Sequence, residues 1–428
     1  MTIFKRREFL KISAAGAAMA GLGGLAGCAG GSKGSGHVVV IGGGFAGASA
    51  AKHIRMWSDN GIAVTLIERN PEFVSCPMSN LVIAGERKLE EITVSYDGLK
   101  KRGVRVVRGE VTAIDPAKRT VTLAGGDSIG YDRLVVSPGI DFIWDKIPGL
   151  TPELANTRFF HGWRAGPQTI GLRRQLEAMP DGGVFAIAIP EVPYRCPPGP
   201  YERACLVAHY LKTRKPKSKL LILDANPDVV AKKALFMAAW KDLYPNIIEY
   251  RAEHDITSLD AATGTLRFLE QDPLKADVLN IIPPQRAGDI ARQAGLATAG
   301  GRWCGVDWRS MESVAHPGIH VLGDATQPAP GMPKSGHIAT QHAKIAAAAI
   351  VNLMSGQELP TPIVVANTCY SYVDNKRAVH VASVHSYDAA DKTYKVVPGS
   401  GGLSAARNEI EGKYGWAWAQ NIWADTLI

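Results

Sequence analysis

Short apolar runs alternate with longer segments of helical pattern over most of the chain, which is typical of parallel strands joined by helices. HVVVI at 37–41 leads into a run of small residues, and IAVTLIERN at 62–70 closes a first strand–helix–strand unit. A second series begins with GGVFAIAI at 182–189 and continues with KLLILDA at 219–225. We therefore expect an α/β fold with two Rossmann-like dinucleotide-binding domains.

A glycine turn follows the first strand. Gly42, Gly44 and Gly47 are spaced as G-x-G-x-x-G, and Glu68 ends the next expected strand. Such a turn lets backbone amides and a helix N-terminus approach a pyrophosphate, and the acidic residue is placed to bind a ribose hydroxyl. A tight turn without a ligand is the alternative. The strand before the turn favours dinucleotide binding.

Two later segments favour FAD over NAD. YDRLVVSPG at 131–139 resembles the strand and turn that return the chain to the FAD domain in two-dinucleotide oxidoreductases. Further on, an apolar strand leads to Gly323 and Asp324, where the carboxylate of that superfamily holds the flavin ribitol. A helix then begins near Lys334, and its N-terminus is placed to stabilise an anionic reduced flavin. The alternative for Asp324 is a carboxylate that only caps a turn.

The second unit lacks the glycines of the first. Helices are expected from Tyr201 and from Asp228, but the first connection, at 190–200, contains five prolines besides Cys196. Prolines cannot bring consecutive amides close to a pyrophosphate as glycines do. We therefore expect a second Rossmann-like domain that does not bind NAD.

CPPGPYE at 196–202, TCYSYV at 368–373 and a tryptophan-rich C-terminus closely resemble the flavoprotein subunit of flavocytochrome c sulfide dehydrogenase. That family is related to the sulfide:quinone oxidoreductases. The resemblance runs from about residue 36 to the end of the chain. It implies bound FAD, sulfide as the substrate, and a c-type cytochrome subunit as partner in a heterodimer.

The resemblance also implies roles for three cysteines. Cys76 matches the cysteine joined through sulfur to the flavin, and the alternative is a buried apolar thiol. Cys196 and Cys369 match a redox-active disulfide that hydrosulfide attacks, with the electrons passing to FAD. A purely structural cross-link is the alternative. Glu202 matches a carboxylate that accepts the sulfide proton, or else it only favours the helix dipole, and Arg195 is placed to attract the anion.

Other residues indicate no further chemistry. Cys205 and Cys304 are expected to be packed thiols. The histidines have no metal-ligand spacing, so no metal site is expected, and no CxxCH haem-attachment motif occurs. A net charge of +8 with scattered lysines and no basic-aromatic array indicates no nucleic-acid partner.

The N-terminus has the pattern of an export signal. Arg6 and Arg7 precede Phe9-Leu10-Lys11 and a weakly hydrophobic run, which is typical of a twin-arginine signal. Leu25-Ala26-Gly27-Cys28 resembles a lipoprotein box, so Cys28 is expected to anchor the protein to the membrane through a lipid, and ordinary signal cleavage is the alternative. A periplasmic location follows from either route.

The C-terminal residues are too few for another nucleotide domain and predict a small α+β interface domain that covers the flavin. Two alternatives stay open for the whole protein: a membrane-associated sulfide:quinone oxidoreductase, and a non-catalytic flavoprotein partner of a periplasmic sulfur-oxidation system. The expected segments, in chain order, are a signal peptide (1–27), a tether (28–36), the first part of the FAD domain (37–149), the second Rossmann-like domain (150–288), the second part of the FAD domain (289–360) and the C-terminal domain (361–428).

Overall fold

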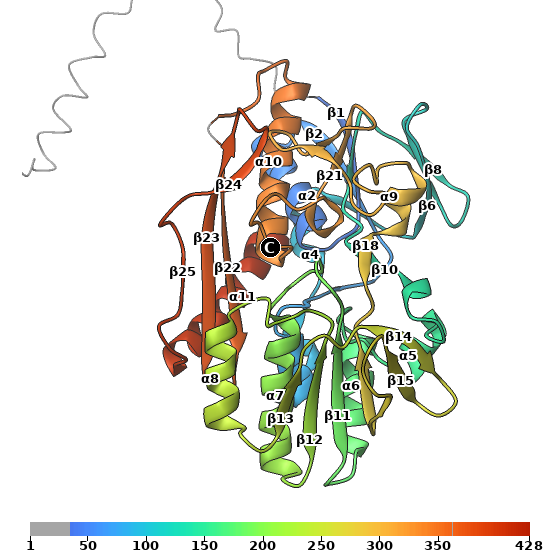
Figure 1. Cartoon of the computed structure of the whole chain (residues 1–428). Coiled ribbons are helices and arrows are strands. Elements are labelled where there is room, and N and C mark those ends of the chain that lie inside the picture. The colour runs from blue at the N-terminus through green and yellow to red at the C-terminus, as the bar shows by residue number, and fades with distance from the viewer. Residues whose placement is uncertain (1–34, 362) are drawn as a thin grey trace, which may run out of the picture. The chain divides into compact units, whose positions relative to one another are not determined.

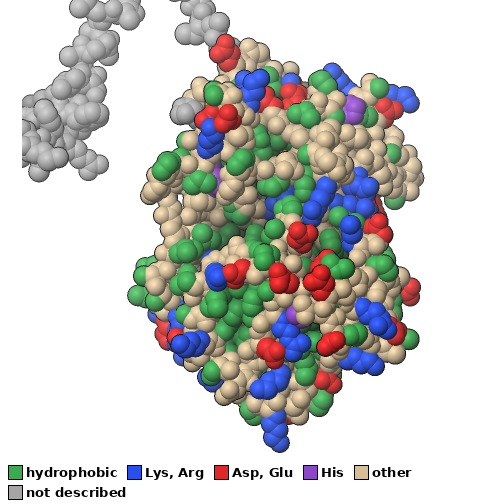
Figure 2. All heavy atoms as spheres, in the orientation of Figure 1, with side chains coloured by type: hydrophobic (Ala, Val, Ile, Leu, Met, Phe, Trp, Pro, Cys, Tyr) green, Lys and Arg blue, Asp and Glu red, His purple; other side chains and the backbone are tan. Residues whose placement is uncertain are grey.

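The computed structural model describes residues 35–361 and 363–428, and Figure 1 traces their course. The expected twin-arginine segment and Cys28 lie outside the described residues. On the face shown in Figure 2, Lys and Arg side chains are interspersed with Asp and Glu side chains. Hydrophobic side chains line a hollow on this face. No helix in the described ranges is long and apolar enough to cross a membrane.

The largest sheet has seven strands. They are β1 (Gly36–Ile41), β2 (Ile62–Glu68), β5 (Arg105–Arg108), β9 (Arg133–Val136), β19 (Val306–Asp307), β20 (Glu312–Ser313) and β21 (Ile319–Val321). Their order is β19-β20-β21-β9-β1-β2-β5, and the five strands from β21 to β5 are parallel. Since β21 pairs with β9 across a long insertion, this domain is discontinuous in sequence. The order is that of a Rossmann-like sheet.

Strand β1 is buried on both faces, as the central strand of a parallel sheet must be. Val39 and Ile41 pack in one hydrophobic core, and Val38 and Val40 pack in another on the opposite face. A strand that is buried on both faces needs a continuous apolar run. In a strand with one face in solvent, apolar and polar residues would alternate.

Two helices rich in alanine pack together beside this sheet. They are α2 (Phe45–Trp57) and α10 (Gly336–Met354), which lie next to each other in Figure 1. Ala46 and Ala48 on α2 and Ala343 and Ala346 on α10 are buried in the same core. Small side chains let two helix backbones approach closely, so the helices hold the glycine turn against the later half of the domain.

The second sheet has four parallel strands in the order β13-β12-β11-β17. Its strands are β11 (Val184–Ile189), β12 (Lys219–Asp224), β13 (Ile248–Arg251) and β17 (Val278–Ile281). The helices of this region are α5 (Pro152–Thr157), α6 (Pro167–Ala178), α7 (Gly199–Arg214) and α8 (Lys233–Leu243). The predicted fold class, with two Rossmann-like domains, is confirmed.

Helix α8 begins five residues later than expected. Asp228 was predicted to start it, but the helix begins at Lys233. The carboxylate of Asp228 accepts a hydrogen bond from the amide of Val229 and pairs with Lys233. Lys232 has a left-handed backbone with φ of 53°, which a continuing helix does not tolerate. The predicted start of this helix at Asp228 was therefore wrong.

The remaining secondary structure consists of small sheets and short helices. The small sheets are made of β3 (Phe73–Val74) and β4 (Thr93–Val94), of β6 (Val111–Asp115), β7 (Thr120–Leu123) and β8 (Ser128–Gly130), of β10 (Ile140–Phe142) and β18 (Gln285–Ala287), and of β14 (Ile256–Asp260), β15 (Thr265–Phe268) and β16 (Leu274–Lys275). The short helices are α3 (Ser79–Ala84), η1 (Leu89–Ile92), α4 (Asp97–Lys101), η2 (Trp144–Lys146), α9 (Asp289–Gln293) and η3 (Gly323–Ala325).

The C-terminal region combines an antiparallel sheet with one long helix, in agreement with the α+β class. Its elements are β22 (Val364–Tyr372), β23 (Ala378–Asp388), β24 (Thr393–Val396), β25 (Gly402–Leu403) and α11 (Glu409–Leu427). Strand β22 contacts α7 and α10, so this sheet touches both Rossmann-like domains. Helix α11 packs on α2, β22 and β23. Trp423 is buried and Trp416 packs partly against the same core. The terminal tryptophans therefore serve largely as core residues.

Candidate functional site

Two of the three motif glycines in the turn after β1 occupy positions that admit no side chain. Gly42 has φ of 93°, and a Cβ atom added there would lie 2.4 Å from the carbonyl oxygen of Ser137. A Cβ atom on Gly47 would lie 1.8 Å from the carbonyl oxygen of Gly42. At Gly44, by contrast, an added Cβ would meet no atom within 4 Å. Two glycines thus allow the tight packing of the turn, and the third leaves space beside the start of α2.

The N-terminus of α2 is suited to an anion. Gly44 is its N-cap, no side chain caps the first turn, and no acidic residue lies in that turn. Free amides and the positive end of the helix dipole favour a phosphate at such a place. Glu68 orders the turn, because one carboxylate oxygen accepts from the amide of Gly43 at 2.6 Å and the other accepts from the amide of Asn70 at 2.8 Å.

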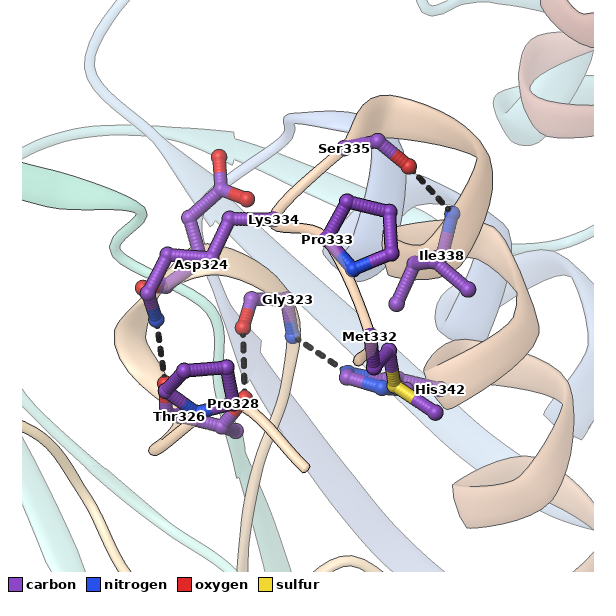
Figure 3. A pocket seen from close by; sticks show the side chains of 10 residues that line it. All are labelled: Gly323, Asp324, Thr326, Pro328, Met332, Pro333, Lys334, Ser335, Ile338 and His342. Atoms are coloured by element: carbon purple, nitrogen blue, oxygen red, sulfur yellow. Dashed lines mark hydrogen bonds between the residues drawn. The ribbon is translucent and has the colours of Figure 1, made fainter. Parts of the chain in front are cut away.

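The segment after β21 contributes a second part of the same domain, shown in Figure 3. The Oδ1 atom of Asp324 is buried and has no hydrogen-bond partner among the described residues. Lys334 donates to the carbonyl oxygen of Asp324 at 2.9 Å and to that of Thr326, and its Nζ lies 3.7 Å from the ring centre of Trp303. Burial lowers the pKa of Lys334 to about 7. The loop that carries Asp324 is therefore held firmly.

These features fit FAD. The open space at Gly44 and the uncapped start of α2 suit its pyrophosphate, and the unpartnered oxygen of Asp324 suits a sugar or ribitol hydroxyl. The N-cap of α10 is Ser335, whose Oγ accepts from the amide of Ile338 at 3.1 Å, as Figure 3 shows. The direct role of Lys334 toward a flavin stays a prediction, since its ammonium group is engaged by backbone carbonyls.

Cys76 lies next to a guanidinium group. It follows strand β3 and is half-buried, and Nη2 of Arg195 donates to its sulfur at 3.2 Å. The same Nη2 also donates to the carbonyl oxygen of Trp163. Arg195 comes from the proline-rich connection of the second domain, so the contact joins the first domain to the turn that carries Cys196.

Cys196 and Cys369 come from different segments and share one environment. Cys196 lies in the turn before α7, where its amide donates to the carbonyl oxygen of Lys334 at 2.8 Å, and Cys369 lies on β22. Loss of solvation, and after it the negative charge of Cys369, together raise the pKa of Cys196 to about 12. Taken as a whole residue, Cys196 is exposed to solvent. All five described cysteines are free thiols here, so the disulfide stays a prediction.

Glu202 bridges the two cysteine-bearing segments. It lies in the first turn of α7, and its carboxylate accepts from the amide of Tyr372 on β22 at 2.8 Å and from the side-chain amide of Asn80 at 2.8 Å. Burial raises its pKa above the usual value for a glutamate, and the two hydrogen bonds only partly offset this. Its charge also helps to raise the pKa values of Cys196 and Cys369. The carboxylate is thus close to both thiols.

Two buried cations near the cysteines were not predicted from the sequence. Arg203 is 2% exposed and donates to the side chains of Asn80 and Asn280 and to backbone carbonyls. Lys232 is 5% exposed, and its Nζ donates to the carbonyl oxygen of Cys369 at 2.7 Å. Arg203 follows Glu202 directly, but neither basic residue differs in local pattern from a surface residue. The sequence offered no signal for either.

The other two cysteines lie in cores. Cys205 and Cys304 are both fully buried, and the indole nitrogen of Trp240 donates to the sulfur of Cys205 at 3.3 Å. Burial raises the pKa of Cys304 to about 12, which keeps it protonated at neutral pH. These environments agree with packed thiols. Within the described residues, no group of His, Cys, Asp and Glu could hold a metal ion.

Three family descriptions match the chain. Residues 36–176 match pyridine nucleotide-disulphide oxidoreductase, residues 169–283 match the central part of the sulfide dehydrogenase (flavocytochrome c) flavoprotein chain, and residues 361–427 match flavocytochrome c sulphide dehydrogenase, flavin-binding. The crystal structure of the sulfide:quinone oxidoreductase from Aquifex aeolicus has a similar fold, with a TM-score of 0.72, 21% identity and coverage of 91% of each chain. Fold and glycine turn thus define a flavoprotein of the two-dinucleotide oxidoreductase class.

The curated relatives narrow this class. The chain is 55% identical over 49 residues, 11% of its own length, to the whole of the flavoprotein chain of sulfide dehydrogenase (flavocytochrome c) from Chlorobaculum thiosulfatiphilum. It is 22% identical over 303 residues to the mitochondrial sulfide:quinone oxidoreductase of Dictyostelium discoideum, a match that covers 68% of this chain and 65% of that protein. The chain belongs to the family of flavocytochrome c sulfide dehydrogenase flavoprotein chains.

Proposed function

We propose that the protein is an FAD-dependent sulfide dehydrogenase in which Cys196 and Cys369 form the redox-active pair. The observation that carries the proposal is the convergence of three groups from separate elements: Cys196 in the turn before α7, Cys369 on β22, and the carboxylate of Glu202 hydrogen-bonded to β22. The names of the relatives agree with sulfide as the substrate.

The chemistry begins with the two cysteines joined as a disulfide. Hydrosulfide attacks one sulfur, a new sulfur–sulfur bond forms, and the other cysteine leaves as a thiolate. A second hydrosulfide attacks the outer sulfur of the resulting persulfide and releases hydrogen disulfide, which leaves both cysteines as thiolates. Two sulfide sulfurs have then lost two electrons in total, and the disulfide has gained them. When bound, FAD supplies the two-electron oxidant that restores the disulfide.

Glu202 accepts the proton when hydrogen sulfide, and not hydrosulfide, enters the site. Its raised pKa makes the carboxylate a better base than a glutamate in water, which suits this role. The hydrogen bonds from Asn80 and Tyr372 fix the orientation of the carboxylate. In the same arrangement, the positive charge of Arg195, which interacts with Cys196, attracts the anion.

Single replacements of the paired cysteines test the proposal. Cys196→Ser and Cys369→Ser should each abolish bleaching of the flavin by sulfide under anaerobic conditions, while reduction by dithionite stays intact. Cys205→Ala is the matched control, because that thiol is fully buried in a hydrophobic core against Trp240, and it should keep sulfide-driven bleaching. If either serine variant reduces its flavin with sulfide at the wild-type rate, the proposed pair is wrong.

We also propose that Cys76 binds FAD covalently. Nη2 of Arg195 donates to the sulfur of Cys76 at 3.2 Å, which holds the sulfur in place where the first domain meets the turn that carries Cys196. After acid denaturation the yellow colour should stay with the wild-type protein and should be released from Cys76→Ala. Complete release of free FAD from the wild type would contradict the attachment and leave noncovalent binding.

The proposed electron acceptor is a c-type cytochrome subunit, and the proposed location is the periplasm after export by the twin-arginine route. Support comes from the printed name of the Chlorobaculum relative and from the N-terminal sequence. The second candidate is quinone reduction, which the likeness to the Dictyostelium protein favours. NADH should not reduce the flavin at a useful rate in either case, because the connection after β11 lacks the glycine turn.

A further inference from the structure

Lys232 is a buried cation in an unusual place. It precedes helix α8, has a left-handed backbone with φ of 53°, and is 5% exposed. Its Nζ donates to the carbonyl oxygen of Cys369 at 2.7 Å, to Oγ of Ser371 at 3.0 Å and to the carbonyl oxygen of Val379 at 3.4 Å. All three acceptors belong to strands β22 and β23. One side chain of the second domain thus holds two strands of the C-terminal sheet.

Burial of an ammonium group is costly unless nearby groups compensate for the lost water. Burial lowers the pKa of Lys232 to about 8, and the negative charges that act against this loss belong to Cys369, Glu202, Cys196 and Glu411, in that order. These groups come from β22, α7, the turn before α7 and α11. The largest compensating charge is therefore the thiolate of Cys369, whose backbone the ammonium group already contacts.

We propose that Lys232 is a positioning residue that fixes the strand carrying Cys369 and stabilises negative charge on the sulfur of that cysteine. For sulfide oxidation this inference rests on the proposed function. Each exchange step leaves charge on one of the paired sulfurs, as a thiolate or as a deprotonated persulfide. A fixed cation beside Cys369 keeps that charge in a site that has lost most of its water.

The surroundings of Cys369 agree with this role. Burial raises the pKa of its thiol, and Lys232 is the largest influence in the opposite direction. The hydrogen bonds with the side chains of Asn367, whose Oδ1 accepts from the thiol at 3.6 Å, and of Ser335 come after it. Glu202 raises the pKa of the thiol and is the acidic group that faces it from α7. Removal of the ammonium group would leave the thiolate with a neighbouring carboxylate and only neutral hydrogen bonds.

Alkylation of Cys369 measures this charge without sulfide turnover. The holoprotein carries Cys196→Ser, so that no disulfide forms, and iodoacetamide reacts at several pH values while mass spectrometry follows the peptide that contains Cys369. Lys232→Met should raise the apparent pKa of the thiol by about one unit, which makes alkylation about tenfold slower below that pKa. Lys232→Arg should restore most of the rate, since it keeps the charge.

Lys233→Met is the matched control. Lys233 is the next residue, lies at the surface and pairs with Asp228, so its removal should leave the profile unchanged. If Lys232→Met does not fold, Lys232→Gln takes its place, because glutamine keeps donors for the two carbonyls and removes the charge. An unchanged alkylation profile in the charge-free variant would overturn the inference.

The two hypotheses can fail separately. A shifted alkylation profile together with sulfide-driven flavin reduction in Cys196→Ser would contradict the proposed function and leave the effect of Lys232 on Cys369 in place. An unchanged profile together with loss of that reduction would contradict the role of Lys232 alone.

Discussion

At the level of single residues, the region around Cys196 and Cys369 contains several buried titratable groups. Glu202, Lys232 and Lys334 all have pKa values displaced toward their neutral forms, mainly by burial. Such displacements concentrate at functional sites, because proton transfer near neutral pH needs groups that titrate there. Each of these groups also has backbone hydrogen-bond partners, which fix its position.

Glu202 gives a prediction with a defined pH dependence. The carboxylate must be ionised to accept a proton, and its pKa is raised, so sulfide oxidation should be lost as the pH falls through that raised value. Glu202→Gln should lower the turnover with sulfide by roughly 100-fold at pH values above this pKa at which hydrogen sulfide is still the main form, in the range found for loss of a general base. The variant should also lack the acidic limb of the rate profile.

Stopped-flow reduction of the flavin by sulfide, measured across the pH range, checks this. Glu86→Gln is the control, since Glu86 lies near His209 at the surface and away from the paired cysteines. An acidic limb that persists unchanged in Glu202→Gln would assign the limb to another group and reduce Glu202 to a structural role at the start of α7.

At the level of elements, the glycine turn and the helix after it decide cofactor binding. Gly47 faces the carbonyl of Gly42 at a distance that excludes any side chain, whereas Gly44 faces open space. Two glycines of one motif therefore have different reasons to be glycine. Gly47 must be glycine because its Cα packs against the carbonyl oxygen of Gly42. Gly44 is suited to glycine because it leaves space for a ligand.

The two alanine replacements should separate these reasons. Gly47→Ala should lower the free energy of unfolding by about 1–3 kcal/mol, because the added methyl group overlaps a carbonyl oxygen. Gly44→Ala should leave the stability of the apoprotein nearly unchanged and weaken FAD binding at least tenfold, because the methyl group enters the space for the pyrophosphate. Urea unfolding and FAD titration of apoprotein measure the two effects. Equal FAD affinity in Gly44→Ala and the wild type would place the pyrophosphate elsewhere.

At the level of the whole molecule, the candidate site depends on three regions. The FAD domain supplies the glycine turn and Cys76, the second domain supplies Cys196, Glu202 and Lys232, and the C-terminal sheet supplies Cys369. Strand β22 contacts both α7 and α10, which brings its cysteine to the boundary between the two Rossmann-like domains. No single region holds the proposed chemistry alone.

The electron acceptor of the whole protein is expected to be a c-type cytochrome. When the protein is purified from the cells that produce it, a c-type haem protein should accompany it, and the complex should reduce haem in the presence of sulfide. A short-chain quinone should be reduced more slowly by the same preparation. Faster reduction of quinone, with no haem protein bound, would favour the second candidate.

Replacement of both Arg6 and Arg7 by lysine should retain the protein in the cytoplasm, which fractionation would detect.

The sequence by itself determined the class of fold and the motifs. Apolar runs such as 37–41 must be buried on both faces, and the spacing of Gly42, Gly44 and Gly47 has few uses other than a phosphate-binding turn. These features depend on residues close together in the chain, so local pattern is enough. The start of α8 was predicted too early, since no local signal announced the left-handed backbone of Lys232.

Only the tertiary structure decided which distant residues meet. It placed the amide of Tyr372 on the carboxylate of Glu202, Arg195 on the sulfur of Cys76, and the ammonium group of Lys232 on the backbone of Cys369. Each contact joins segments more than a hundred residues apart, and Lys232 looks like an ordinary surface residue in the sequence. Lys232 is a buried cation in contact with the backbone of Cys369 because the three regions enclose it. This burial does not follow from any property of the residue itself.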